Sequence, residues 1–257
     1  MFDLIFLGTA ACDFSPLLKT ECKERFDNNA RRASSMLVNG SCLIDAGDHI
    51  IDSLRIAEVP LDNITDIFIT HIHSDHFNPE NIARIAEAKS DSLRLWVGDK
   101  AMIPQIPNTE VIRTEDYQTI TTDTGISVTG LTANHDPAAC PRYLFLEKDG
   151  KKLLYATDGG WFLNKTYFFL QNKGLDLMAI DATCGDYVGD FRMAEHNSIP
   201  MIRLMMPSLR TIGALKENSR VFLTHIAPSL HKSHEETVKI VAPDGLEVAF
   251  DGLKLTI

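Results

Sequence analysis

Residues 65–76 read TDIFITHIHSDH, a short apolar run that passes directly into three histidines and an aspartate. The run is rich in β-branched and aromatic residues, which is typical of a buried strand. His71, His73, Asp75 and His76 would then lie on the loop that follows this strand. Imidazole nitrogen and carboxylate oxygen suit a divalent transition metal, and four such groups within six positions exceed the three protein ligands of one catalytic site. The segment therefore predicts a site for two metal ions.

The same layout, an apolar strand followed by a histidine or an aspartate, recurs further along the chain. His135 follows SVTGLTAN, Asp158 follows KKLLYAT and His225 follows RVFLT. A histidine taken alone is more often structural than a ligand, but its place in this ordered series favours metal binding. We therefore expect these three residues to meet the first four at one edge of the predicted sheets.

Short β-rich runs recur between turn signals over the whole sequence, and two pairs of them flank tight-turn dipeptides. These dipeptides are Asn39-Gly40 and Asp149-Gly150, of the type that joins antiparallel strands. Helical candidates follow the strands in both halves of the chain, at residues 79–90, 161–174, 198–218 and 233–241. The third is interrupted at Pro207, which predicts either two helices or one kinked helix.

This order of elements predicts an α/β fold in four layers, αββα, with two mixed β-sheets packed face to face and helices on the outside. A length of 257 residues without a linker-like stretch predicts a single domain over residues 1–257. Hydrophobic residues make up 44% of the chain, enough for a sizeable core.

Charge and hydropathy restrict the partners of the protein. A net charge of −10 disfavours nucleic-acid binding, which requires a basic surface. The apolar N-terminus has no basic segment before it, and no run is long enough to span a membrane, so we expect a cytoplasmic protein without a membrane partner. The five cysteines contain no CxxC pair, which favours reduced thiols.

Five segments, in order, resemble the signature motifs of the metallo-β-lactamase superfamily: LIDAG at 43–47, THIHSDH at 70–76, the loop of His135, YATDGG at 155–160 and LTHIAP at 223–228. The resemblance implies the metallo-β-lactamase fold and a dinuclear metal site.

Carried over position by position, the resemblance assigns a role to each candidate ligand. One metal would be held by His71, His73 and His135, and the other by Asp75, His76 and His225. Asp158 would bridge the two metals, and Asp45 would orient the ligands from behind. The metals would be Zn²⁺ or Mn²⁺, and the donor types also accept Fe²⁺ or Ni²⁺. A hydroxide bridging the metals would be the nucleophile of a hydrolase, with Asp75 also steering protons.

Three further segments are similar to the cyclic phosphodiesterase branch of that superfamily, which includes the phosphoribosyl cyclic phosphate hydrolase of phosphonate breakdown. They are GTAACDFSP at 8–16, NARRASS at 29–35 and EHN at 195–197. The resemblance implies that His196 is a catalytic general acid; the alternative is that His196 caps the following helix. The CxCxxC cluster of that phosphonate enzyme is absent, so we expect no third metal.

Three more residues are candidates for substrate contacts. Arg31 and Arg32 could clamp a phosphate, or could belong to a solvated loop. His231 could line the site, or could belong to an exposed helix start.

The sequence thus favours a metal-dependent phosphodiesterase acting on a small phosphate ester, cyclic esters included. A lactonase or thioesterase on the same dinuclear site is an alternative that does not require His196, and a metal-bound carrier or sensor without turnover is another. A di-iron reductase is disfavoured, because that branch carries a carboxylate at the position of His73. A homodimer is compatible with the expected fold.

Overall fold

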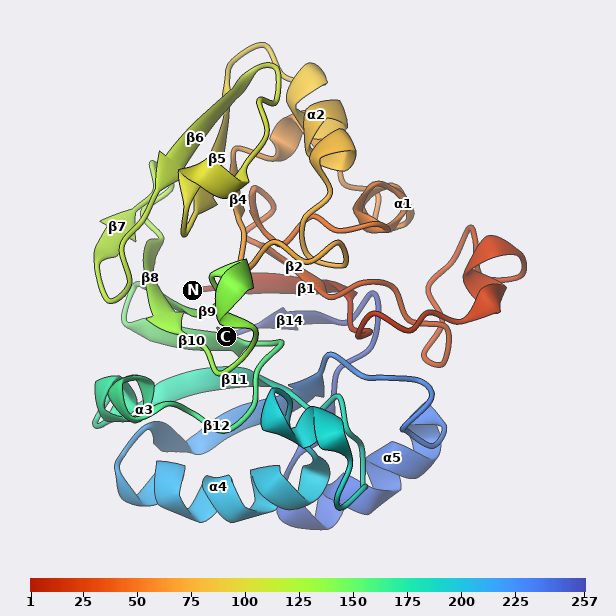
Figure 1. The fold of residues 1–257 in the computed structure, drawn as a ribbon, viewed down its shortest axis with the longest axis vertical. Helices are drawn as coiled ribbons and strands as arrows, with labels where there is room; N and C mark the ends of the chain where they lie inside the picture. Colours follow the sequence, from red (N-terminus) through yellow and green to blue (C-terminus); the bar gives the residue numbers. More distant parts are fainter.

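The computed structural model describes all 257 residues, and its strands form two seven-stranded sheets (Figure 1). The first sheet is antiparallel from β14 to β3 and parallel from β3 to β6. In spatial order its strands are β14 (Lys254–Thr256), β1 (Asp3–Gly8), β2 (Ser35–Val38), β3 (Cys42–Ile44), β4 (Asp66–Phe68), β5 (Leu93–Val97) and β6 (Thr109–Arg113).

The second sheet is also mixed. It is parallel from β13 to β10 and antiparallel from β10 to β7. In spatial order its strands are β13 (Glu247–Val248), β12 (Leu215–Thr224), β11 (Leu175–Asp181), β10 (Lys151–Ala156), β9 (Arg142–Lys148), β8 (Ser127–Thr132) and β7 (Thr119–Thr121). Chain segments far apart in sequence therefore lie side by side, and β11 runs between the strands that precede Asp158 and His225.

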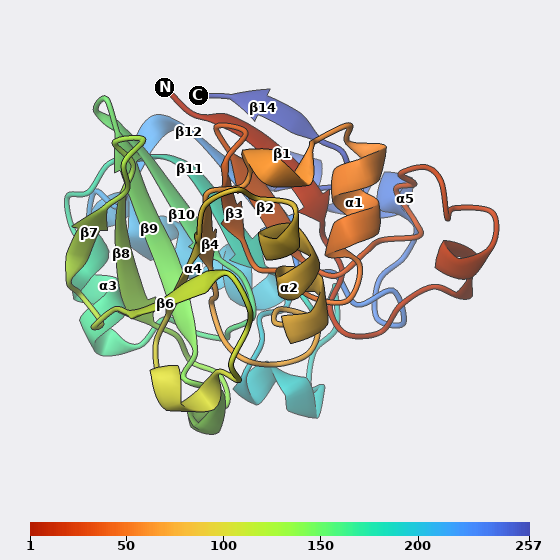
Figure 2. The same ribbon diagram turned by 90° about the horizontal axis from the view of Figure 1, so that it is seen from above.

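The two sheets pack face to face through a core of buried side chains contributed by both. Within it the rings of Phe6 and Phe222 lie 5.8 Å apart. Helices α1 (Ile50–Ile56) and α2 (Pro79–Glu87) cover the outer face of the first sheet (Figure 2). Helices α3 (Asn164–Leu170) and α4 (Ile199–Thr211) cover the second, with α5 (His234–Val241) beside them. The predicted fold class is confirmed.

Local sequence signals explain several of these boundaries. Both residues of the Asn39-Gly40 and Asp149-Gly150 turns have positive φ, as two-residue hairpins require. Helix α4 runs without a break through Pro207, so the segment predicted as helical at 198–218 contains one helix. This helix ends at Thr211, and the prediction was wrong for the last residues of the segment, which from Leu215 on belong to β12. The side chain of Ser198 caps the N-terminus of α4, which excludes the alternative that His196 is the cap.

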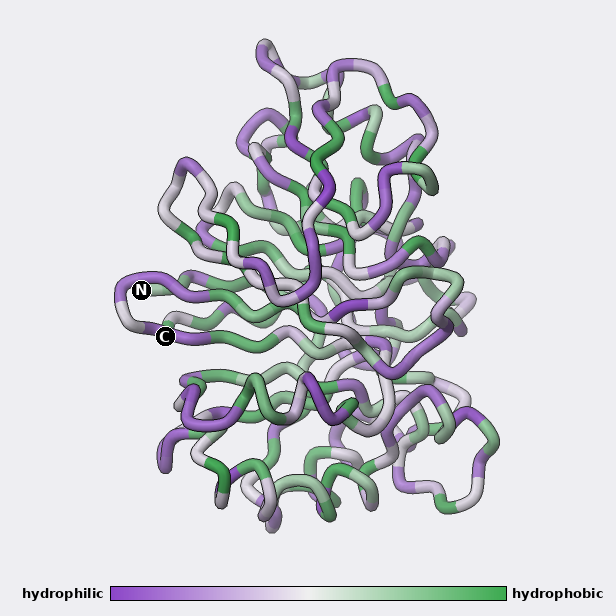
Figure 3. Tube along the Cα trace, turned by 60° about the vertical axis from the view of Figure 1, so that its left-hand side comes forward, coloured by the Kyte–Doolittle hydropathy of each residue, from purple (hydrophilic) through white to green (hydrophobic).

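Apolar residues gather along the strands and on the inward sides of the helices, and the connecting loops are mostly hydrophilic (Figure 3). None of the helices combines the length and the hydropathy that crossing a bilayer requires. The loops after β3, β4, β8, β10, β11 and β12 carry the polar residues described next.

Candidate metal centre

Backbone conformation helps to present several of the candidate ligands. Asp45 and His225 directly follow strands β3 and β12, Asp158 comes two residues after β10, and all three have positive φ, between 53° and 60°. This region is costly for residues other than glycine and is often found at functional sites. Gly47 of the LIDAG segment allows a close approach, because a Cβ there would lie 1.9 Å from the carbonyl oxygen of Asp75.

A first cluster of donor atoms brings together three histidines and one carboxylate. His73 Nδ1 lies 3.0 Å from His71 Nε2 and 3.1 Å from His135 Nε2. Asp158 Oδ2 lies 2.9 Å from His71 Nε2. The sequence resemblance grouped these four residues around one metal, and the structure brings them together.

A second cluster lies on the other side of Asp158. His76 Nε2 and His225 Nε2 are 3.2 Å apart. Asp75 Oδ2 is 3.3 Å from the first of these nitrogens and 3.6 Å from the second. Asp158 Oδ2 completes the group at 3.2 and 3.5 Å from the same nitrogens. Asp158 belongs to both clusters, which is the position of a bridging ligand.

The donor geometry fits metal ions. Metal–nitrogen bonds of about 2.0–2.1 Å in tetrahedral geometry separate neighbouring donor atoms by roughly 3.3 Å, close to the distances within both clusters. The two Nε2 atoms of His76 and His225 point at one another, an arrangement that a shared cation satisfies. Asp158 Oδ1 is buried and has no hydrogen-bond partner in the protein. A set of five imidazoles and two carboxylates suits two divalent transition metals.

Asp45 supports the second cluster from behind. Its Oδ2 lies 2.8 Å from His76 Nδ1, and its Oδ1 accepts a hydrogen bond from the backbone N–H of Thr70 at 2.8 Å. The Asp45 side chain is fully buried. A carboxylate on the far nitrogen of a ligating histidine fixes the ring orientation and tautomer.

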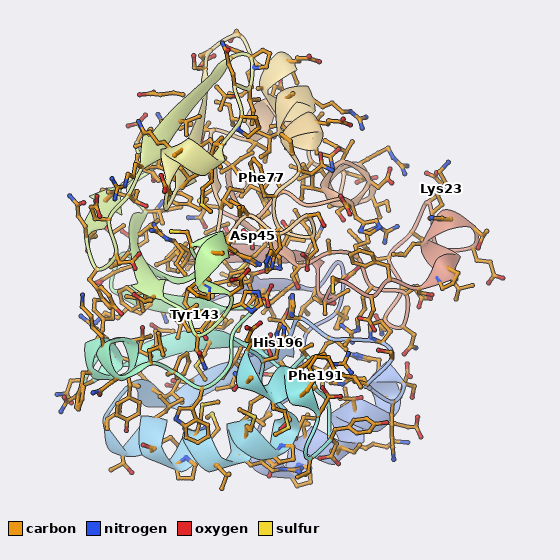
Figure 4. The ribbon with its side chains drawn as sticks, viewed as in Figure 1. Lys23, Asp45, Phe77, Tyr143, Phe191 and His196 are labelled. Atoms are coloured by element: carbon orange, nitrogen blue, oxygen red, sulfur yellow. The ribbon has the colours of Figure 1, made fainter.

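Asp181, which the sequence analysis did not select, supports the opposite side. Its Oδ2 lies 3.2 Å from His225 Nδ1 and 3.1 Å from His196 Nδ1. Its Oδ1 accepts from the backbone N–H of Asn197 at 2.8 Å. Asp181 ends strand β11, so it follows the same layout of apolar strand and then acidic residue. In Figure 4, Asp45 lies on the side of the first sheet, and His196 lies on the side of the second.

His196 lies directly beside the two clusters. Its Nδ1 is 3.3 Å from Asp158 Oδ1, and its ring stacks on that of His225 with centroids 5.6 Å apart. The side chain is 14% exposed, so it borders the opening of the site. Because Asp181 engages Nδ1, Nε2 is the nitrogen that remains for a substrate.

Neighbouring charges in the centre shift the pKa values of its histidines and carboxylates against the effect of burial. Burial alone would raise the pKa of Asp158, but the neighbouring His225 and His71 hold this pKa well below its ordinary value. Burial would likewise lower the pKa of His225, yet Asp158, Asp181 and Asp75 raise it to about 10. The metal-free centre therefore holds protons that metal ions would displace.

Burial also opposes protonation of His196, but the adjacent Asp181 outweighs it, and the pKa of His196 is raised. Burial lowers the pKa of His135 to about 4, and the opposing effect of Asp158 does not outweigh it. His135 is therefore neutral at physiological pH, as a metal ligand must be, whereas the raised pKa of His196 favours its protonated form.

The remaining candidates lie outside the clusters. Arg32 donates to the carbonyl oxygen of Cys22 at 2.6 Å and to other carbonyls nearby, so it anchors that loop and is not available to clamp a phosphate. His231 Nε2 donates to the carbonyl oxygen of Ala182 at 2.6 Å. Arg31 is buried against a separate cavity, so neither arginine belongs to a solvated loop.

Two mixed sheets packed between helices, with paired histidine and aspartate clusters at the strand ends, define this chain as a protein of the metallo-β-lactamase fold. A family model described as Anti-Pycsar protein Apyc1 matches residues 2–85. No curated protein matches the sequence.

Solved structures with this architecture cover nearly the whole chain. A diphosphatase of the PhnP family has a TM-score of 0.76 at 20% identity, over 99% of this chain and 96% of its own. YhfI of Bacillus subtilis, a metallo-β-lactamase fold protein, has a TM-score of 0.74 at 16% identity, over 99% of this chain and 98% of its own. Zn²⁺-bound PqqB of Methylobacterium extorquens has a TM-score of 0.73 at 18% identity, over 99% of this chain and 100% of its own. These similarities establish the fold.

Proposed function

We propose that this protein is a metal-dependent hydrolase that cleaves small phosphodiesters, cyclic esters included. The observation that carries the proposal is the position of His196, whose Nδ1 lies beside Asp181 and beside the carboxylate shared by both clusters. The similarity to a diphosphatase, an enzyme that acts at phosphorus, supports the same reaction class.

The chemistry divides between the metals and the protein. Two divalent cations in the clusters would supply a strong nucleophile by lowering the pKa of water and would neutralise charge on phosphoryl oxygens. His71, His73 and His135 would hold one cation, Asp75, His76 and His225 the other, and Asp158 both.

The leaving group explains the need for His196. An alkoxide that departs from phosphorus is a strong base, and a positioned acid that protonates it accelerates the reaction by about 10²–10⁴-fold. Two features of His196 suit such an acid: the neighbouring Asp181 raises its pKa against the effect of burial, and its Nε2 is free. Asp75, on the far side of the second cluster, would accept the proton that the attacking water loses.

The acidic surface restricts the substrate. A net charge of −10 repels polyanions such as nucleic acids, so a small ester attracted locally by the metals suits the protein better. We therefore place the substrate among small phosphodiesters.

The test is hydrolysis of linear and cyclic phosphodiesters by protein loaded with Zn²⁺ or Mn²⁺. We expect turnover, and we expect His196→Ala to lower kcat by about 10²–10⁴-fold while two metals remain bound. His49→Ala is the matched control, because His49 lies outside the clusters, with its ring against Phe14. Intact phosphodiesters alongside cleaved lactones or thioesters would instead assign the site to a carbonyl hydrolase.

A further inference from the structure

Arg31 is a buried cation that the proposed chemistry does not use. Its side chain is almost entirely enclosed, with the residue 3% exposed. One of its terminal nitrogens, Nη1, donates to Thr9 Oγ1 and to the carbonyl oxygen of Ala249, and Nη2 lies 3.0 Å from His234 Nδ1. These contacts use three of the five guanidinium N–H groups, so two have no partner in the protein.

No carboxylate pairs directly with Arg31. The nearest buried acid, Asp251, accepts hydrogen bonds from Thr9 Oγ1 and from the backbone N–H of Arg32 instead. Burial lowers the pKa of Arg31 to about 10, which still leaves it charged at neutral pH. A buried charge without a counterion is costly, so such an arginine usually has an anionic partner.

A cavity of about 210 Å³ lies beside Arg31, lined by residues of α5 and of the segment that leads into β2. One lysine and two histidines line it besides Arg31: Lys232, His231 and His234. Burial lowers the pKa of both histidines, so Lys232 is the second cation of the lining. Its wall includes the segment that follows His225, so one stretch of chain separates this cavity from the metal centre. The cavity belongs to neither donor cluster.

The hydrogen bonds of these groups determine which of them can donate to a ligand in the cavity. Because Arg31 donates to Nδ1 of His234, the proton of that neutral ring lies on Nε2, where it is a donor. Lys232 is exposed and forms no ion pair. Of the two glutamates at the start of α5, Glu236 is occupied by the capping box with Ser233. Glu235 raises the pKa of Arg31 by its charge, but it forms no ion pair with Arg31 and does not line the cavity.

We propose that this cavity is a second anion-binding site, which takes a phosphate group. Donors that converge from a guanidinium, an ammonium and an imidazole match the several oxygens of a tetrahedral anion better than the two of a carboxylate. The group could come from a free phosphate or from a second, uncleaved phosphate of the substrate. Only the latter source rests on the proposed function.

The first experiment measures binding of inorganic phosphate to the full-length, metal-loaded protein by calorimetry. We expect a saturable site that remains when the metals are chelated, which separates it from phosphate bound at the metal centre. Lys232→Ala should weaken this site about 3- to 30-fold, because it removes one charge-assisted donor. Arg31→Gln should abolish it, with circular dichroism to verify folding.

Lys239→Ala is the matched control, since it removes the same charge from α5 at a position that does not line the cavity. Equal weakening by Lys232→Ala and Lys239→Ala would overturn the proposal, because the attraction would then come from net charge. Loss of all phosphate binding on chelation would overturn it as well.

A second experiment distinguishes the two sources of phosphate. It compares a phosphodiester that carries an additional phosphate monoester with the same diester lacking it. A KM that rises in Lys232→Ala for the first substrate alone identifies a substrate phosphate. Unchanged KM values for both, with inorganic phosphate still bound, identify a free anion. Absence of turnover would refute the proposed function and leave the binding result intact.

Discussion

The carboxylate of Asp181 lies 3.1 Å from Nδ1 of His196. The same oxygen contacts His225, so one buried acid holds both the proposed general acid and a proposed metal ligand. Its position between them follows from the sheet, in which β11 pairs in parallel with both β10 and β12. Asp181 is therefore a positioning residue, and its removal should affect protonation and metal binding together.

Asp181→Asn should lower kcat for phosphodiesters by about 10–100-fold. Burial lowers the pKa of His196, and the negative charge of Asp181 outweighs burial and raises it. Asparagine keeps the shape of the side chain but removes this charge. A general acid works in its protonated form, so activity falls as pH rises through its pKa. The alkaline limb of the kcat profile should consequently move to lower pH. Asp186→Asn, on an exposed loop, is the control, and an unmoved limb would contradict this role.

Asp158 should control the occupancy of both metal sites. We expect two metal equivalents in the wild-type protein and fewer than one in Asp158→Ala, because this carboxylate belongs to both donor clusters. His73→Ala should reduce occupancy to about one, since His73 belongs to the first cluster only. Elemental analysis after gel filtration measures the ratio. Two metals retained in Asp158→Ala would exclude a bridging role.

Metal binding should release protons at pH 7.5. Burial lowers the pKa of His225, but the carboxylates around it outweigh burial and raise this pKa to about 10 in the metal-free protein. The pKa of His76 is also raised well above its usual value, for the same reason, by Asp75 and Asp45. Both rings are then protonated below their raised pKa values, and a cation must displace these protons.

Calorimetric titration with Zn²⁺ in buffers of different ionisation enthalpy gives the number of protons released. We expect at least one per protein, and an apparent affinity that rises with pH. Titration without any dependence on the buffer would show that the rings are already neutral.

The sequence could bring the candidate metal ligands to one edge of the sheets because each of them follows its own strand, and this inference needs no knowledge of how the strands pair. Asp181 has the same local signal, at the end of LDLMAID, but its importance depends on β11 lying between β10 and β12. That order is a property of the tertiary structure and cannot be read from spacing along the chain.

The burial of Arg31 and Arg32 could not be predicted from the sequence. Their loop is polar and resembles a solvated turn, yet the backbone N–H of Arg32 donates to Asp251, which is 219 positions away in sequence. The C-terminal segment contributes to the burial of both arginines, because Arg31 donates to the carbonyl oxygen of Ala249 and the backbone N–H of Arg32 donates to Asp251. Contacts of this range are set by the assembled sheet, so the cavity beside Arg31 was not predictable.

The interface between the two sheets should dominate the stability of the fold. Phe222 on β12 is 1% exposed and packs against Phe6 of the opposite sheet. Phe222→Ala would remove a large buried ring and leave a cavity, which costs about 3–5 kcal/mol of unfolding free energy. Phe168→Ala is the matched control, because that ring is 62% exposed and its loss should cost less than about 0.5 kcal/mol. Urea denaturation of the two variants, monitored by circular dichroism, measures the difference. Similar midpoints for both would mean that the sheets are held together mainly by other contacts, such as the loops that carry the candidate metal ligands.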